Sequence, residues 1–264
     1  MSEPASRVAP LPPPPPPATG SPRYFALLYC PAAARPALST LLALADEISA
    51  GAGRGLDHSV AHLRLDWWRA ESERYGRGEP QHPWLRALLH EPGGGRLMLQ
   101  PLVDAAASDL ATETLAAQPG ANLQRTVFEL AEAALRGVQD TQPPAAQLQR
   151  ALRALGEGAC ELERFAGARL RPAAATAAAP AAAAPAAAAQ AALEALRQQA
   201  CAIDRALQPR LTPLLVWIAL AAGQARRRLQ RPPGKGGALL DAFADNIVAW
   251  NAARRAARGR FRID

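Results

Sequence analysis

The sequence predicts an all-α fold, and its composition and hydrophobic periodicity carry that prediction. Nearly half of the 264 residues are hydrophobic, yet only 5% are aromatic, and alanine dominates the hydrophobic set. Alanine has the highest intrinsic helix propensity of the amino acids. Runs of β-branched and aromatic residues, which are typical of strands, are scarce along the chain. The length suits one large domain or two small ones.

The chain begins with a proline-rich stretch over 1–22, which includes six consecutive prolines, so we expect a disordered or polyproline II tail there. Residues 24–30, YFALLYC, form a short apolar segment that we expect to be helical and that ends at Pro31. Pro36 suits the first turn of the next helix. The buried stripe of that helix is expected to hold Leu38, Leu41, Leu42, Ala45 and Ile48, with Ser49 on the same side.

A central helix is predicted after a glycine-rich turn. It begins with LDHSVAHLRLDWWR at 56–69 and runs to about Tyr75. At about 100° per residue, its main apolar stripe holds Leu56, Val60, Leu63 and Trp67. Leu65 and Trp68 add apolar surface elsewhere, and a helix that is apolar on more than one side belongs inside a bundle.

The polar residues of this helix, His58, His62 and Asp66, are spaced by four residues. This spacing suits a metal or an anion, but hydrogen bonding to neighbouring helices explains it as well.

Turn residues divide the middle of the chain into further helices. The stretch GRGEPQHP, three glycines at 93–95, Gly120 and the pair Pro143 and Pro144 mark their ends. The helices that we expect between these turns cover 84–89, 96–117, 122–138 and 145–170.

An alanine-rich stretch over 172–192 separates a helical region over 23–171 from C-terminal helices over 193–264, which we expect to complete the same bundle. Pro180 and Pro185 interrupt any helix in this stretch, so we predict a linker or loop, with helix resuming at 190–207. The most apolar run, 211–222, is too short to cross a bilayer, which needs about 20 residues, and predicts a buried core helix. The last helix, over 238–258, places Leu240, Phe243, Ile247 and Trp250 at helical spacing.

The net charge of +7 belongs to the C-terminal end. From Gly223 onwards the chain has ten basic and three acidic residues, and the remainder has twenty of each. The arginines at 226–228 and 254–262 are candidates to bind an anionic membrane surface. A helix end whose cations complement the helix dipole explains them as well. Nucleic acid is not expected as a partner, because Phe261 alone is an aromatic residue interleaved with these arginines.

The three cysteines, Cys30, Cys160 and Cys201, show no zinc-site spacing and cannot all pair with one another. A reducing cytoplasm is therefore the expected location, either in solution or peripheral to the inner face of the membrane.

Two stretches carry a resemblance to a known family. RYFALLYCPAAARPAL and LDHSVAHLRLDWWRAESERYGRGEPQHPWLRAL resemble the N-terminal half of the squalene/phytoene synthase family. LQPLVDAAASDL and the helix after it resemble that family's third and fourth helices, so the resemblance covers about 23–140. It implies an isoprenoid-synthase-like helical bundle around an apolar cavity. Active members join two prenyl diphosphates head to head, and two aspartate-rich motifs hold Mg²⁺ against the diphosphates.

The positions of those motifs depart from the family pattern. The first motif's two aspartates fall near Ser49 and Gly53, and no aspartate occurs between Asp140 and Asp204, where the second motif belongs. Mg²⁺ requires hard oxygen ligands, which aspartates at i and i+4 supply from one helical face. We therefore expect no metal site. Glu47, Glu157 and Glu161 are the candidate substitutes, although a solvated face with Arg153 and Arg164 as partners explains Glu157 and Glu161 as well.

Three functions follow as alternatives. The first is a non-catalytic squalene/phytoene synthase-like protein that binds an isoprenoid or a protein partner, similar to family members that act as assembly factors for respiratory complex I. The second is an active prenyl diphosphate transferase with non-standard Mg²⁺ ligands, and only this function would require Mg²⁺. The third is a basic adaptor at a membrane surface. The candidate contacts for a diphosphate or another polar ligand are Arg35, Ser49, His58, His62, Arg64 and Arg69.

Overall fold

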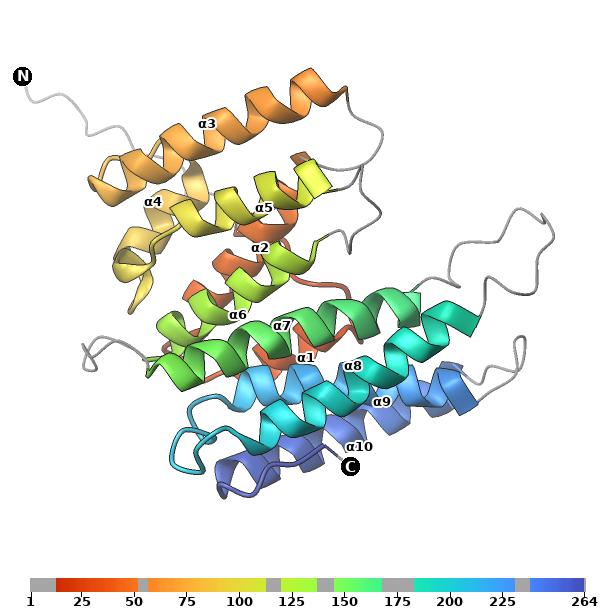
Figure 1. The fold of residues 1–264 in the computed structure, drawn as a ribbon. Coiled ribbons are helices and arrows are strands. Elements are labelled where there is room, and N and C mark those ends of the chain that lie inside the picture. Colours follow the sequence, from red (N-terminus) through yellow and green to blue (C-terminus); the bar gives the residue numbers. More distant parts are fainter. Residues whose placement is uncertain are drawn as a thin grey trace, which may run out of the picture.

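The computed structural model describes residues 13–51, 57–112, 120–136, 145–167, 183–230 and 238–263, and over these residues it contains helices but no strand. The predicted all-α class is therefore confirmed. Figure 1 shows the helices stacked from α3 at one end, through α5, α6 and α7, to α9 and α10 at the other. In chain order they are α1 (Pro22–Leu28), α2 (Arg35–Gly51), α3 (His58–Gly76), α4 (Pro83–His90), the 3-10 helix η1 (Gly94–Arg96), α5 (Gln100–Thr112), α6 (Ala121–Arg136), α7 (Ala146–Gly167), α8 (Ala183–Cys201), α9 (Thr212–Gln230) and α10 (Ala238–Ala257).

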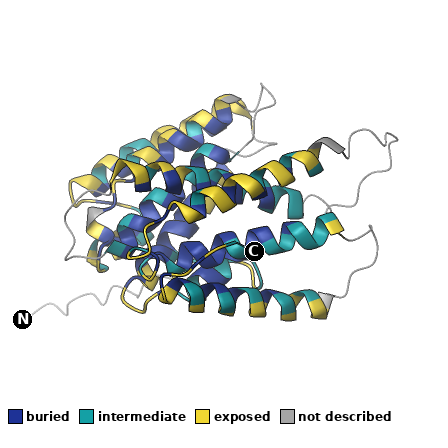
Figure 2. Ribbon diagram, turned by 60° about the horizontal axis from the view of Figure 1, so that its bottom comes forward, coloured by how far each residue is buried: buried dark blue, intermediate teal, exposed yellow. Residues whose placement is uncertain are grey.

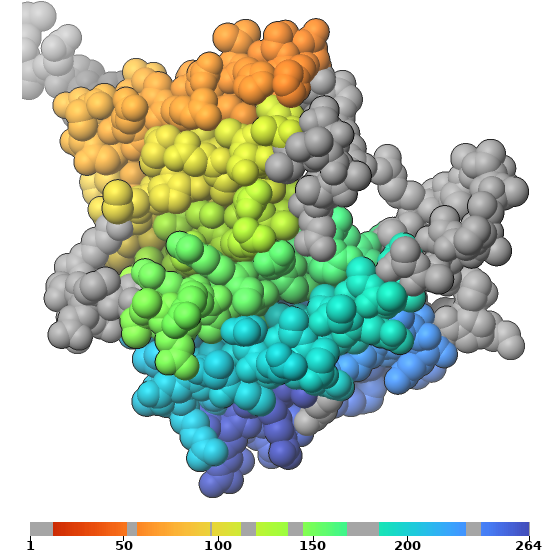
Figure 3. All heavy atoms as spheres, viewed as in Figure 1, coloured from red at the N-terminus to blue at the C-terminus, as the bar shows by residue number. Residues whose placement is uncertain are grey.

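Helix α9 is the core helix that its apolar run predicts. Its residues from Pro213 to Ala225 are largely buried, and it contacts α1, α7, α8 and α10. Trp217 is fully buried, and its ring centroid lies 5.0 Å from that of Phe128 on α6. Figure 3 shows that the C-terminal helices pack directly against α7. The residues after 183 thus share one core with the N-terminal helices.

Two glycines allow α7 to approach its neighbours closely. A Cβ atom at Gly156 would lie 2.7 Å from the backbone oxygen of Gln124 on α6. A Cβ atom at Gly158 would lie 2.7 Å from the side chain of Leu196 on α8. Since real Cβ atoms avoid such distances, α7 needs glycine at both positions to pack between α6 and α8.

Helix α2 buries its five predicted apolar residues, and Pro36 stands in its first turn as predicted. The prediction for Ser49 is wrong, because this residue is exposed. Ile48 turns inward at this end of α2 and Ser49, about 100° further round the helix, points outward. The predicted first-motif position at Gly53, like Leu56 of the predicted central stripe, lies outside the described residues.

Helix α3 is an edge helix rather than the central one, and the prediction of its buried face is wrong. Val60, Leu63 and Trp67 are exposed, with Leu63 at 69% and Trp67 at 44%. The residues that face the core instead follow the same three- and four-residue spacing on another side of the helix. They are Ala61, Leu65, Trp68, Ser72 and Tyr75. Because both sides carry apolar residues at helical spacing, periodicity could not select between them.

Helix α10 presents its large apolar residues outward. Its buried apolar residues are small, Ala249, Ala252, Ala253 and Ala256, and this side contacts α9. Alanine at helical spacing allows two helices to approach closely, which explains why α10 packs through this side. In Figure 2, α10 is the lowest helix, and exposed residues follow its outer face.

Some element boundaries differ from those predicted. Helix α5 begins at Gln100 rather than at 96, because η1 and a short extended stretch precede it. Helix α8 begins at Ala183, inside the stretch predicted as a linker, and Pro185 stands in its first turn, where proline is tolerated. Residues 172–182 of that stretch lie outside the described part, as do residues 1–12 of the tail. In the part of the chain that the structure describes, no helix combines the length and the apolar character that crossing a bilayer requires.

Candidate functional site

The six predicted ligand residues do not meet in one place. Arg35 begins α2, and its guanidinium donates to the backbone oxygen of Cys30 at 2.9 Å. Ser49 lies near the opposite end of the same helix. A helix of 17 residues is about 25 Å long, so the two residues cannot contact one small ligand.

The other four candidates lie on α3. His58 and His62 are exposed, and their Nε2 atoms are 3.1 Å apart. Arg64 is exposed as well. Arg69 is half-buried between Asp66, at 2.6 Å, and Asp104 of α5, at 3.7 Å. These contacts of His58, His62 and Asp66 therefore lie within α3, whereas the simpler interpretation of this helix predicted contacts with neighbouring helices.

Glu47 lines a surface cavity of about 460 Å³ together with Asp46, His82 and Trp84. Its carboxylate lies 3.5 Å from Nε2 of His82, and the neighbouring Asp46 is ion-paired with Arg23 of α1. Both carboxylates therefore have a basic partner.

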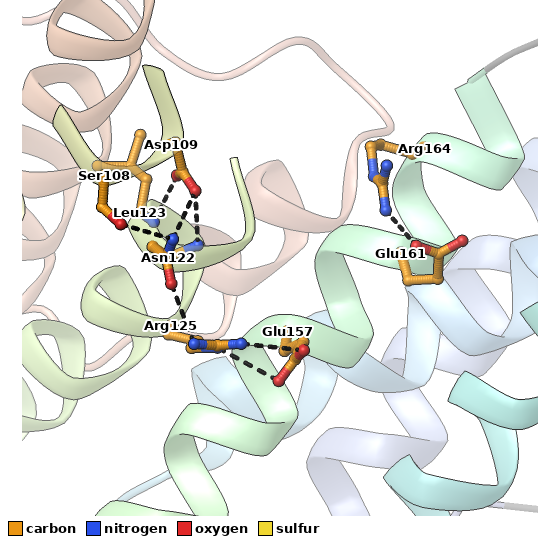
Figure 4. Close-up of polar contacts among 8 residues, drawn as sticks. All are labelled: Ser108, Asp109, Asn122, Leu123, Arg125, Glu157, Glu161 and Arg164. Atoms are coloured by element: carbon orange, nitrogen blue, oxygen red, sulfur yellow. Dashed lines mark hydrogen bonds and ion pairs between the residues drawn. The ribbon is translucent and has the colours of Figure 1, made fainter. Parts of the chain in front are cut away.

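Glu157 and Glu161 lie one turn apart on α7 and contact different arginines (Figure 4). Glu157 binds Arg125 of α6, with 3.0 Å between the carboxylate and guanidinium atoms. Glu161 binds Arg164 of its own helix. The prediction of arginine partners is confirmed for Arg164, whereas Arg153 binds Glu129 of α6 instead.

The same close-up shows a polar network at the start of α6, centred on Asp109 of α5 (Figure 4). The Asp109 carboxylate accepts hydrogen bonds from the backbone N–H groups of Asn122, at 3.1 Å, and Leu123, at 2.9 Å. These N–H groups belong to the first turn of α6 and have no partner inside that helix. Burial raises the pKa of Asp109, while these bonds and the charge of Arg125 oppose the rise. Asp109 thus caps α6.

We expect replacement of Asp109 by alanine to lower the free energy of unfolding by about 2 kcal/mol, because two helix N–H groups lose their acceptor. Urea denaturation measures this change. Replacement of the exposed Asp104 of α5 by alanine is the matched control and should cost less than about 0.5 kcal/mol. Equal losses in the two variants would contradict the capping role.

Another polar cluster, centred on Glu163 and Arg23, combines residues from five helices. Glu163 of α7 accepts a hydrogen bond from the indole of Trp217. Arg23 of α1 lies over the same indole, 5.3 Å from its centroid, and donates to Gln124 of α6 at 3.0 Å as well as to Asp46 of α2. Burial raises the pKa of Glu163, and Arg23 opposes the rise. The sequence predicted no role for Arg23, because its partners are far away in the chain.

The described residues contain no group of three or more His, Cys, Asp or Glu side chains that is placed to hold a metal ion. All three cysteines are free. Burial raises the pKa of both Cys30 and Cys160 to about 11, so both remain thiols at neutral pH.

A cavity of about 600 Å³ lies at the C-terminal end, and arginines dominate its wall. We call it the arginine-lined cavity. None of the described residues that line it is acidic. One arginine belongs to the connection between α8 and α9, and the others belong to the end of α10 and the segment after it. The six are Arg205, Arg254, Arg255, Arg258, Arg260 and Arg262.

Backbone contacts fix the wall of the arginine-lined cavity. The N–H of Phe261 donates to the side-chain oxygen of Gln208 at 2.8 Å. Gly259 has a φ of +62°, and a Cβ atom there would lie 2.9 Å from the backbone oxygen of Arg205. Glycine at this position therefore allows the chain to turn after α10 and pack against the α8–α9 connection. The charge of the C-terminal end was predicted from sequence, but the contribution of Arg205 was not.

Comparisons of the chain with protein-family models, curated proteins and solved structures found no match. The family resemblance therefore depends on the sequence motifs alone.

Proposed function

We propose that this protein is a non-catalytic member of the squalene/phytoene synthase family that acts by binding a partner rather than by prenyl transfer. One observation carries the proposal. The three acidic side chains that were candidates to replace the family's aspartates, Glu47, Glu157 and Glu161, each lie against a basic side chain.

Prenyl transfer needs carboxylates that face one another across a shared space and are available to Mg²⁺. Glu157 and Glu161 come from one helix and contact different arginines. Ser49, near the expected first motif, is uncharged and exposed. A metal would have to displace existing ion pairs and gather ligands from separate places.

The family-like segment over 56–88 has a structural role that does not require catalysis. Glu71 of α3 accepts hydrogen bonds from the backbone N–H groups of Gln81 and His82 at 2.7 and 2.6 Å. Arg86 of α4 donates to the backbone oxygen of Pro80 at 3.0 Å. These bonds join α3 to α4 through the GEPQHP loop. A chain could therefore retain this segment to preserve its scaffold after losing the magnesium ligands.

The side chains at the centre of the bundle favour a partner at the surface over an enclosed isoprenoid. Trp217 and Phe128 contact each other between α6 and α9, and both are fully buried. At the surface, Val60, Leu63 and Trp67 of α3 are exposed at helical spacing, and contiguous exposed apolar surface is a feature of protein interaction sites. An assembly factor that binds another protein fits both features.

A thermal-shift experiment with farnesyl thiodiphosphate, a non-hydrolysable prenyl diphosphate, tests the proposal. We expect Mg²⁺ to add nothing to any shift that the ligand alone produces, since no carboxylate pair is available to link metal and diphosphate. Mg²⁺ alone and Mg²⁺ with inorganic diphosphate are the controls. A rise in melting temperature that requires both Mg²⁺ and the ligand, and that Glu157→Gln or Glu161→Gln abolishes, would establish the transferase alternative instead.

A further inference from the structure

The C-terminal end of the molecule combines two features that the proposed function does not use. One is the arginine-lined cavity. The other is the apolar stripe of α10, which we define as Leu240, Phe243, Ile247 and Trp250. Both consist of described residues, and they adjoin each other.

The apolar stripe of α10 follows a three- and four-residue spacing, so its four side chains point to one side of the helix. All four are exposed, with Phe243 at 67% and Trp250 at 53%. The two acidic residues of α10 face α9 instead, where Asp241 and Asp245 both bind Arg227. The outward side of α10 therefore presents large apolar residues and no carboxylate.

Arg254 links the stripe to the cavity. It occupies the next helical position after Trp250, and its guanidinium lies 4.8 Å from the centroid of the Trp250 ring. Arg254 also lines the arginine-lined cavity. An apolar surface thus continues directly into a cationic one, with tryptophan and arginine at the boundary, which is typical of helices that lie at a membrane interface.

We propose that α10 lies in the plane of an anionic membrane, with its apolar stripe among the acyl chains and a lipid phosphate in the arginine-lined cavity. Guanidinium groups bind phosphate oxygens through paired hydrogen bonds, and the wall of this cavity brings several guanidinium groups together. Aromatic and aliphatic side chains on the outward face of a helix bury their surface at the boundary between head groups and acyl chains.

The helix dipole does not account for this arrangement. It explains cations in the last turn of α10, which holds Arg254 and Arg255. Arg205 comes from a different segment, and Arg260 lies beyond the helix end, yet both line the same cavity.

Charge also favours a membrane over a second copy of the chain. A helix pair that used the apolar stripe would extend to Arg254, the next residue of the same spacing. In a parallel pair the two copies of Arg254 would face each other, and in an antiparallel pair Arg254 would face a leucine of the stripe. An anionic bilayer accepts both the apolar residues and the arginines.

Co-sedimentation with lipid vesicles tests this inference on the full chain. We expect the protein to bind vesicles of equal parts phosphatidylcholine and phosphatidylglycerol at least about tenfold more tightly than vesicles of phosphatidylcholine alone. High salt should markedly weaken the binding to the anionic vesicles. Phe243→Glu should reduce this binding at least about fivefold, as should Arg258→Glu combined with Arg260→Glu. The changed residues are exposed, and circular dichroism checks that each variant remains folded.

Matched controls are Leu63→Glu on the exposed side of α3 and Arg150→Glu on α7, which should bind vesicles as the unchanged protein does. Equal binding to neutral and anionic vesicles would contradict the proposal, as would full binding by the Phe243→Glu variant. A melting-temperature rise with glycerol phosphate that equals the rise with vesicles would indicate a soluble phosphate ligand instead. A dimer that Phe243→Glu dissociates, without vesicle binding, would assign the stripe to self-association. The inference does not depend on the proposed function, because an active transferase would present the same surface.

Discussion

Replacement of Trp217 by alanine is expected to lower the free energy of unfolding by about 3–5 kcal/mol, the usual cost of removing a large aromatic side chain from a core. Trp217 is fully buried on α9, packs against Phe128 and lies beneath the guanidinium of Arg23. Its indole also donates a hydrogen bond to Glu163, so the variant leaves a buried carboxylate without that donor. Guanidinium-induced unfolding, followed by circular dichroism, measures the loss.

Trp67→Ala is the matched control for this prediction. Trp67 is 44% exposed on α3, and its ring contacts only the neighbouring Trp68 and the partly buried His82 among the ring pairs of the structure's described residues. We expect this variant to lose less than about 1 kcal/mol. A loss for Trp67 that matches the loss for Trp217 would show that α3 is the central helix, as its apolar stripe had suggested.

Glu71→Ala is expected to lower the free energy of unfolding by about 2–4 kcal/mol. The Glu71 side chain is fully buried, and one of its oxygens accepts from the N–H groups of Gln81 and His82. Its other oxygen binds Arg74, with the closest atoms 2.6 Å apart. The variant would leave two backbone donors and a partly buried cation without this carboxylate. Urea denaturation measures the loss, and faster proteolysis near 77–82 would show that the loop has been released.

Two further variants separate the role of Glu71 from a general effect of charge. Glu73→Ala removes an exposed carboxylate from the same turn of α3 and should change stability by less than about 0.5 kcal/mol. Glu71→Gln retains an oxygen for the two backbone donors but loses the charge that binds Arg74, so we expect an intermediate loss. If Glu71→Ala left the free energy of unfolding unchanged, the structural explanation for the family-like segment would be wrong.

The sequence predicted the helices well because their apolar residues recur at helical spacing and glycine or proline separates them. Helix α9 was identified as a core helix because its run at 211–222 is apolar on every side, so any orientation buries that run. Helix α3 has two apolar sides, and the structure buries the one that also carries Glu71. The contact of Glu71 with the GEPQHP loop distinguishes the two sides, and no local pattern reveals that contact.

The partners of the polar residues were harder to predict than the helices. The pair Glu161 and Arg164 was predictable because its members are three residues apart on one helix. Asp109 and the start of α6, or Arg125 and Glu157, come together only when helices pack. The sequence located the positive charge at the C-terminal end, but the position of Arg205 in the same cavity depends on the turn at Gly259.

Release of diphosphate from farnesyl or geranylgeranyl diphosphate, measured with and without Mg²⁺, tests the central claim most directly. The account predicts no release above that of heat-denatured protein at any Mg²⁺ concentration, because the carboxylates at the expected motif positions are replaced or bound to basic side chains. Mg²⁺-dependent release that EDTA abolishes, accompanied by a coupled prenyl product, would contradict it.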